Sequence, residues 1–528
     1  MNDFPFLTFL ILLPILAGLT LALSPKMAAK TSQGLGIMVA IATLIVSGVL
    51  ASSFFGADST IQFKQQVEWI PTIGASYFVG IDSVASWMIL LTSFLGLIAI
   101  LISKPAERVN QYIGLLLCLE GTLFGVFSSL DMLLFYAFFE LSLIPVALMI
   151  LGWGSGDKGK VAIRYVGVLF AGSLLMLVGM TILSAQASKI IGHPTFNSIE
   201  LQELVGRGLW ANAWPLQVLA FWGFMIAFLV KSPVVPVHRW LADTYQDAPI
   251  GAVVAGVVLK VGTFGMFRFV LPLFPEACRA FAPIIVGIGV VGIIYGGILA
   301  AVQNNPGRLM AFSTVSHVGY ILVGLFSLNH YGMMGAAFQQ VNHGIAAAAV
   351  FVLLNFLYER SPNRSLKDFG GLKKSMPIFS TLFLIAMLTN LGLPFTSGFI
   401  GEILALLGAF TAGHSGLNGL NVGFVYVAAI GSILSAAYML YMYQRLFYGK
   451  TSQGESLKDL TVRETLIGAT FAAIILILGI LPMTMLRSLE PRVETIHAMV
   501  DNGEKQVVVQ AHSNQPAGIK LAEVRGAK

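Results

Sequence analysis

Apolar runs of about twenty residues recur along the whole chain, and they limit its fold more than any other feature. A run of this length spans a bilayer as one helix, because backbone polar groups inside lipid must bond to one another. Of the 528 residues, 56% are hydrophobic and 11% are charged, whereas soluble domains carry about 25% charged residues. The sequence therefore predicts an all-α polytopic membrane protein with about fourteen transmembrane helices.

The boundaries of the predicted helices follow the apolar runs, and residues after about 490 are read as a polar C-terminal tail. The predicted spans are 4–23, 34–55, 77–103, 111–130, 131–153, 161–186, 215–236, 249–272, 282–302, 309–328, 332–358, 377–412, 422–447 and 464–486.

Two of these spans contain a break. The span 377–412 is too long for one simple crossing and contains Gly392 and Pro394, so we expect it to break midway. The span 215–236 should end early, near Pro233. Interrupted helices in comparable places are typical of transporter repeats, although isolated proline kinks are the alternative. Because each break lies close to a charged residue, we favour a functional role.

The basic residues indicate a topology. Lys and Arg concentrate in the loops that follow the odd-numbered predicted helices, and the largest basic loop runs from Arg360 to Lys374. The positive-inside rule places these loops in the cytoplasm and both termini outside it.

Four ionisable residues lie deep inside apolar runs: Glu140, Lys231, Lys260 and Glu402. Each charge near the membrane centre costs about 2.5–3.5 kcal/mol on insertion scales, so four together cost roughly 10 kcal/mol. Burial and a nearby opposite charge act in opposite directions on proton affinity, so such groups can exchange a proton when their separation changes. Static salt bridges that hold helices together are the alternative; we favour a proton relay.

Two histidines strengthen this interpretation. His317 and His343 fall inside successive predicted helices, between Lys260 and Glu402 in the chain. Histidine titrates near neutral pH and passes protons in both directions. One membrane histidine is more often a packing residue, but two on successive helices favour a relay.

Other candidates are weaker. Whether Glu120 or Asp131 takes part stays open, and Arg268 is read as a structural residue that snorkels toward the interface. The two cysteines, Cys118 and Cys278, have no metal-ligand or disulfide spacing. The sequence contains no zinc signature, phosphate-binding loop or iron–sulfur cysteine set, so we predict no cofactor and no metal in this chain.

Five segments together carry a specific resemblance to a known family. They are DMLLFYAFFELSLIPVALMILGWG, VKSPVVPVHRWLADTYQDAPIGAVVAGVVLKVGTFGMFRF, RLMAFSTVSHVGY, QQVNHGIAAAAVFVLLNFLYER and LGLPFTSGFIGEILAL. They resemble the antiporter-like proton-translocating family, and within it the M-type subunits of bacterial NADH–quinone oxidoreductase, homologues of mitochondrial complex I chain 4. The resemblance runs through most of residues 110–450.

The resemblance implies a fold with two inverted five-helix repeats. It divides the chain into an N-terminal three-helix segment, two repeats, a last helix and the tail. These parts are 1–110, 111–272, 282–447, 464–490 and 491–528.

The resemblance also implies a role for each buried residue. Glu140 and Lys231 match the first carboxylate–lysine pair of the family, and Lys260 matches its central lysine. His317 and His343 match the histidines of the connecting path. Glu402 matches the glutamate on the exit side, where L-type, N-type and Mrp antiporter subunits usually have lysine.

The implied activity is proton translocation by a membrane-arm subunit, a part of a translocase, driven by quinone reduction in other subunits. NADH, FMN, iron–sulfur clusters and quinone are then expected on those subunits. The implied partners are L-type and N-type membrane subunits and the lipid bilayer, with no nucleic acid. The expected location is the bacterial plasma membrane, with a thylakoid membrane as the alternative. An Mrp-type cation/proton antiporter subunit and a passive membrane scaffold are the alternative functions.

Overall fold

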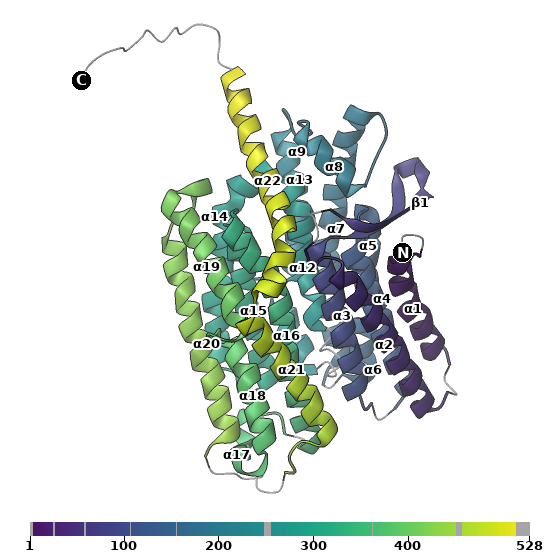
Figure 1. Cartoon of the computed structure of the whole chain (residues 1–528), viewed down its shortest axis with the longest axis vertical. Coiled ribbons are helices and arrows are strands. Elements are labelled where there is room, and N and C mark those ends of the chain that lie inside the picture. Colours follow the sequence, from purple (N-terminus) through teal and green to yellow (C-terminus); the bar gives the residue numbers. More distant parts are fainter. Residues whose placement is uncertain are drawn as a thin grey trace, which may run out of the picture.

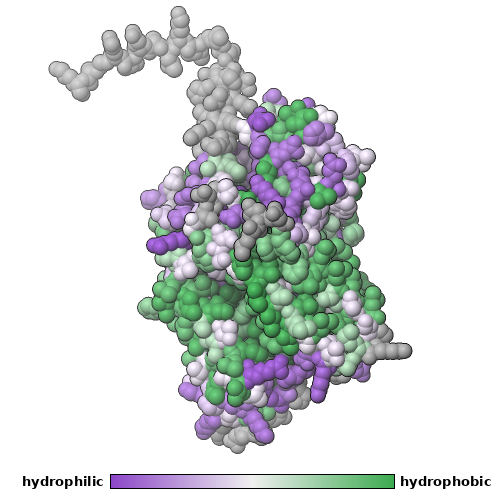
Figure 2. Space-filling model, turned by 45° about the vertical axis from the view of Figure 1, so that its right-hand side comes forward, coloured by the Kyte–Doolittle hydropathy of each residue, from purple (hydrophilic) through white to green (hydrophobic). Residues whose placement is uncertain are grey.

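The long helices of the computed structural model stand side by side in one bundle (Figure 1). The structure describes residues 4–24, 27–56, 60–105, 107–154, 156–247, 255–361, 363–449 and 457–513. Within these ranges, 13 helices are long and apolar enough to cross a membrane. Figure 2 shows hydrophobic residues gathered in a belt on the visible face, with hydrophilic residues above and below it. The predicted fold class, an all-α polytopic membrane protein, is confirmed.

Most crossings are single helices. They are α1 (Phe6–Ala22), α2 (Ala29–Ser52), α3 (Ser83–Ile102), α4 (Val109–Ser128), α7 (Lys158–Ile191), α9 (Trp214–Lys231), α14 (Pro275–Ala301), α15 (Pro306–Leu325), α16 (His330–Arg360), α20 (Gly423–Phe447) and α21 (Val462–Ile480). Short elements lie between them: α8 (Ser198–Gly206), α10 (Arg239–Asp247), η4 (Leu366–Asp368), α17 (Leu372–Ser375) and η5 (Leu417–Gly419).

Three crossings are built from more than one piece. They are α5 (Met132–Leu141) with α6 (Leu143–Trp153), α18 (Pro377–Asn390) with α19 (Ser397–Ser415), and the chain of α11 (Ala255–Val258), α12 (Lys260–Gly265), the π-helical turn η3 (Met266–Val270) and α13 (Leu271–Leu273). Adding α1 to the 13 long spans, with α18 and α19 as one crossing, gives the predicted fourteen.

Both predicted breaks are present. The chain leaves helical geometry between α18 and α19, where Gly392 has a φ of 71°. Helix α9 ends at Lys231, two residues before Pro233, which cannot donate a backbone hydrogen bond to a continuing helix. Part of the span predicted over 249–272 lies outside the described residues, which resume at 255.

A β-hairpin replaces the start of the helix predicted over 77–103. Strands β1 (Gln62–Ile70) and β2 (Ala75–Ile81) pair antiparallel around the turn η1 (Pro71–Ile73). Helix α3 begins only at Ser83, where the Asp82 side chain accepts a hydrogen bond from the Ala85 backbone N–H. The helical prediction was wrong here, because a short apolar run has no periodicity that separates a strand from a buried helix.

The C-terminal region also differs from its prediction. Within the segment read as a polar tail, the chain is helical as far as residue 513, as part of α22 (Met483–Ser513); residues 514–528 lie outside the described part. One face of α22 is buried through side chains spaced three or four residues apart: Met485, Leu489, Val493, Ile496 and Val500. The many charged residues between them obscure this amphipathic pattern in the sequence.

A buried ion cluster joins three distant parts of the chain. The Asp82 carboxylate lies 2.8 Å from Nη2 of Arg268 on η3 and 3.1 Å from Nε of Arg492 on α22. Arg268 also donates to the backbone carbonyls of Phe127 and Ser129 at the end of α4. Arg268 therefore has a structural role, as predicted, but it does not snorkel: its side chain is 2% exposed and paired inside the protein.

We expect Asp82→Asn to lower the free energy of unfolding by about 3–5 kcal/mol, because it leaves two buried guanidinium groups without a counter-charge. An earlier midpoint on heating the solubilised protein would measure this loss. Glu203→Gln is the control, since Glu203 and Arg207 form an exposed pair worth at most about 1 kcal/mol.

The pH dependence of this effect has a definite sign. Burial alone would raise the pKa of Asp82, but the charges of Arg268 and Arg492, together with the hydrogen bonds from Ala85 and Arg268, outweigh burial and hold that pKa below its ordinary value. The stabilisation is therefore complete above the unfolded-state pKa of about 4 and is lost as pH falls through the lower folded-state pKa. A wild-type advantage over Asp82→Asn that disappears already near neutral pH would contradict this account.

Candidate functional site

The first buried pair lies where two helices are interrupted. Lys231, the last residue of α9, is fully buried, and its Nζ donates to Ser142 Oγ at 3.2 Å. Ser142 is the residue at which α5 ends and α6 begins. The Lys231 ammonium also lies 4.3 Å from the centre of the Phe139 ring, close enough for a cation–π contact.

Glu140 lies beside this lysine near the end of α5. Its carboxylate and the Lys231 ammonium interact electrostatically. Its Oε1 is buried and has no hydrogen-bond partner among the described residues. The described ion pairs do not include one between Glu140 and Lys231, and Glu140 is hydrogen-bonded to Ser173 on α7 instead.

Lys260 and His343 form the closest contact of the site. Lys260 begins α12 and is fully buried, and its Nζ lies 2.7 Å from His343 Nδ1 on α16. At this distance one nitrogen donates a proton to the other, so a charged lysine requires an unprotonated Nδ1. The two side chains consequently share one proton in a hydrogen bond. This bond joins α12 to α16, through residues that are 83 positions apart in the sequence.

The row continues through a second histidine to Glu402. The rings of His343 and His317 have their centres 5.3 Å apart, and His317 Nδ1 lies 2.9 Å from Glu402 Oε1. This last contact is close enough for an ion pair but lacks hydrogen-bond alignment at the ring nitrogen. Both histidines are 2% exposed and Glu402 is 5% exposed, so bulk water reaches none of them freely.

Amide side chains that the sequence analysis missed line the same row. Gln339 Nε2 donates to Glu402 Oε1 at 3.5 Å, and Asn342 Nδ2 donates to Gln339 Oε1 at 3.0 Å. Thr263 Oγ1, one turn after Lys260, donates to Gln340 Oε1 at 3.1 Å. The available signal was the polar segment QQVNH inside an otherwise apolar helix, because buried amides are costly unless they are hydrogen-bonded.

The six predicted site residues thus form two groups. Lys260, His343, His317 and Glu402 make one continuous row, while Glu140 and Lys231 form the other group. The groups meet through backbone neighbours, since Ser232 Oγ donates to the Leu259 carbonyl at 3.4 Å. The described contacts do not include one between the Lys231 and Lys260 side chains.

Asp131 has a clear local contact set. Its Oδ1 accepts from the backbone N–H groups of Leu133 and Leu134 at the start of α5, and its Oδ2 accepts from the Ser76 backbone N–H on β2. These are the contacts of a helix N-cap that also ties the hairpin to the bundle.

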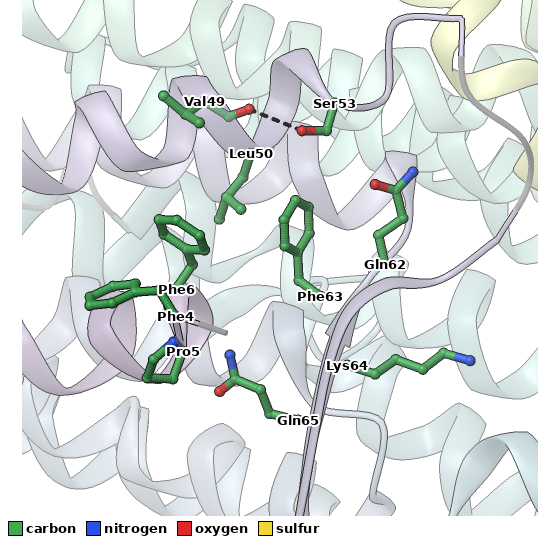
Figure 3. A pocket seen from close by; sticks show the side chains of 10 residues that line it. All are labelled: Phe4, Pro5, Phe6, Val49, Leu50, Ser53, Gln62, Phe63, Lys64 and Gln65. Carbon is green, nitrogen blue, oxygen red and sulfur yellow. Dashed lines mark hydrogen bonds between the residues drawn. The ribbon is translucent and has the colours of Figure 1, made fainter. Parts of the chain in front are cut away.

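One pocket lies away from this row. Figure 3 shows it between the start of α1, the end of α2 and β1, with a volume of about 650 Å³. Phe4, Phe6, Leu50, Phe63 and Lys64 are among its lining residues, and none of the six predicted site residues lines it. Within the described residues, no cluster of three or more His, Cys, Asp or Glu side chains could hold a metal ion.

Residues 129–431 match the family model described as NADH:quinone oxidoreductase/Mrp antiporter, TM. NADH-quinone oxidoreductase subunit M of Rickettsia prowazekii (strain Madrid E) is 34% identical over 506 residues, covering 94% of this chain and 99% of the relative. NADH-ubiquinone oxidoreductase chain 4 of Marchantia polymorpha is 35% identical over 504 residues, with 94% and 96% covered.

Two solved structures share the fold. A chain of respiratory complex I from Thermus thermophilus with bound NADH has a TM-score of 0.81 and 28% identity, covering 94% of this chain and 99% of that chain. A chain of the Mrp complex from Dietzia sp. DQ12-45-1b has a TM-score of 0.79 and 20% identity, with 94% and 98% covered. The second likeness concerns the fold alone.

The break between α18 and α19 can be tested at Gly392. A Cβ there would meet the Glu402 carboxylate, and the φ of 71° strains any other residue. We expect Gly392→Ala to cost about 1–3 kcal/mol of stability and to displace Glu402 from His317. Heating of the solubilised protein measures the loss of stability.

Gly167→Ala on α7 is the matched control, because a Cβ at Gly167 meets nothing within 4 Å. There the change should be neutral or stabilising, since alanine favours helix more than glycine does. Equal midpoints for Gly392→Ala and Gly167→Ala would show that the break does not depend on glycine.

Proposed function

This chain belongs to the NADH:quinone oxidoreductase/Mrp antiporter family, and we propose that its buried residues from Glu140 to Glu402 carry protons across the membrane. It is a membrane-arm subunit of a proton-translocating NADH-quinone oxidoreductase, of the M or chain 4 type. Quinone reduction in other subunits supplies the driving force. The single observation that carries the proposal is the 2.7 Å contact between Lys260 and His343, which continues through His317 to Glu402.

Proton transfer along this row begins where Lys260 donates to His343 and ends at the Glu402 carboxylate. Between these ends, the His343 and His317 rings are tilted by 55° with centres 5.3 Å apart, and no direct hydrogen bond joins them among the described contacts. Gln339 can orient Glu402, because its amide donates to the carboxylate oxygen that faces His317.

The Glu140–Lys231 pair would control this transfer by electrostatics. A perturbation from a neighbouring subunit changes the separation within the pair, and Lys231 then changes the field at Lys260. Two unit charges about 10 Å apart interact by roughly 1.7 kcal/mol at an effective dielectric constant of about 20. That energy shifts a protonation equilibrium about tenfold, which is sufficient to bias the direction of transfer.

The partners and location of this chain can be stated first in general terms and then as a more specific proposal. The chain works with other membrane subunits in one respiratory complex, as a multi-pass membrane protein. We propose L-type and N-type subunits as its direct neighbours and the bacterial plasma membrane as its location, with both termini outside the cytoplasm. The basic loop from Arg360 to Lys374 supports this orientation.

The alternative is a cation/proton antiporter subunit. The shared fold with the Mrp complex chain makes it worth testing. Relatives that match nearly the full chain at 34–35% identity are NADH-quinone and NADH-ubiquinone oxidoreductase subunits, and they favour the redox-driven function.

We expect Lys260→Met and Lys231→Met to lower NADH-driven proton translocation by about tenfold or more, because the first removes a titratable group from the row and the second removes the charge that acts on it. The measurement is quenching of a pH-sensitive dye in vesicles that contain the assembled complex. Lys158→Met is the matched control, since Lys158 lies exposed at the start of α7. Normal translocation by Lys260→Met in intact complex would refute the relay, and strict dependence on sodium would favour the antiporter.

The orientation predicts which side of the membrane a thiol reagent reaches. Both native cysteines are buried, so they contribute little background. Lys367 on η4 and Glu203 on α8 are exposed. Figure 1 shows α8 and α17 toward opposite ends of the bundle, and η4 comes directly before α17 in the chain. We expect an impermeant maleimide to label Glu203→Cys in intact cells and Lys367→Cys only in inside-out vesicles; the reverse pattern would place both termini in the cytoplasm.

A further inference from the structure

Glu120 is a buried carboxyl group that the proposed relay does not use. It lies in the middle of α4 and is fully buried. Its Oε1 lies 2.7 Å from Thr43 Oγ1 on α2, and its carboxyl group packs against Gly96 on α3, where a Cβ would meet it. Its Oε2 is buried and has no hydrogen-bond partner among the described residues.

No cation balances this carboxyl group in the part of the chain that the structure describes. The elements packed against α4 include α1, α2, α3, β2, α5, α6 and α12. Helices α1, α3 and α6 carry no titratable side chain. The titratable residues on α4 itself and on the remaining elements are Lys30, Tyr77, Tyr112, Cys118, Tyr136, Glu140 and Lys260. The described ion pairs and hydrogen bonds link none of them to Glu120, and Lys260 is bonded to His343 instead.

The Thr43 hydroxyl group contacts two oxygen atoms at once. Its Oγ1 lies 3.0 Å from the Ala40 carbonyl and 2.7 Å from Glu120 Oε1, but a hydroxyl group has only one proton to donate. A single shared proton would make two weak, bifurcated bonds, whereas both contacts are full hydrogen bonds when Glu120 supplies a second proton. Thr43 then donates to the Ala40 carbonyl, and the Glu120 O–H donates to Thr43 Oγ1.

Energetics point the same way. An ionised carboxylate without a partner cation is far more costly to bury than a neutral acid, and such groups take up a proton. We therefore propose that Glu120 is a proton-binding site separate from the relay, held as a neutral carboxylic acid between α2, α3 and α4. Its ligand is a single proton, and the site adds no charge to the field that acts on Lys260. This inference does not depend on the proposed function.

Infrared difference spectroscopy of the purified complex tests the site directly. We expect Glu120→Gln to remove one C=O stretching band of a protonated carboxylic acid from the wild-type spectrum at neutral pH. Thr43→Val is the second variant, because it keeps the shape of Thr43 but removes the acceptor, so the same band should shift and remain. Loss of a carboxylate band in Glu120→Gln, or an unmoved band in Thr43→Val, would overturn the proposal.

Proton translocation distinguishes this site from the relay. Glutamine can donate from its amide to Thr43 as the neutral acid does, so Glu120→Gln should translocate protons at the wild-type rate. Lys260→Met serves as the inactive control in the same vesicles. Loss of translocation in Glu120→Gln would show that Glu120 belongs to the relay. Normal translocation in Lys260→Met would refute the relay and leave the infrared result on Glu120 unaffected.

Discussion

The contact between Lys260 and His343 is the interaction on which the interior depends. It places two nitrogen bases 2.7 Å apart inside a helix bundle, where the two cannot both be protonated without repelling each other. The surrounding bundle must therefore allow the single positive charge of the pair to lie on either residue. Uncharged polar groups lie nearby in the sequence of both helices: Thr263, one turn after Lys260, donates to Gln340, which precedes His343 by three residues.

Helix interruptions determine where these groups stand. Lys231 ends α9, Lys260 begins α12 beside a π-helical turn, and Glu402 lies near the start of α19, five residues after Ser397. At each interruption the backbone leaves regular helical geometry, and lipid cannot satisfy the polar groups that this exposes. Charged residues and helix interruptions therefore lie together in the protein interior, where each provides polar groups that can stabilise the other.

Some site residues and elements could be predicted from the sequence, and others could not. Lys231 and Lys260 could be identified from the sequence, because a charged residue inside an apolar run is costly to place in lipid and is therefore conspicuous. Gln339 and Asn342 are neutral and escape that test, although they line the same row. The hairpin of β1 and β2 was not predicted because its short apolar run has no periodicity that separates a strand from a helix. The apolar face of α22 was not predicted because charged residues lie between its apolar residues in the sequence.

The cluster around Asp82 has a consequence for biosynthesis. A ribosome makes the chain from the N-terminus, so Asp82 enters the membrane long before Arg268, and Arg268 long before Arg492. For most of translation, the carboxylate has no more than one of its two final partners. The ion cluster is complete only when α22 docks, so a chain that terminates before Arg492 leaves Asp82 with Arg268 as its remaining partner in the cluster.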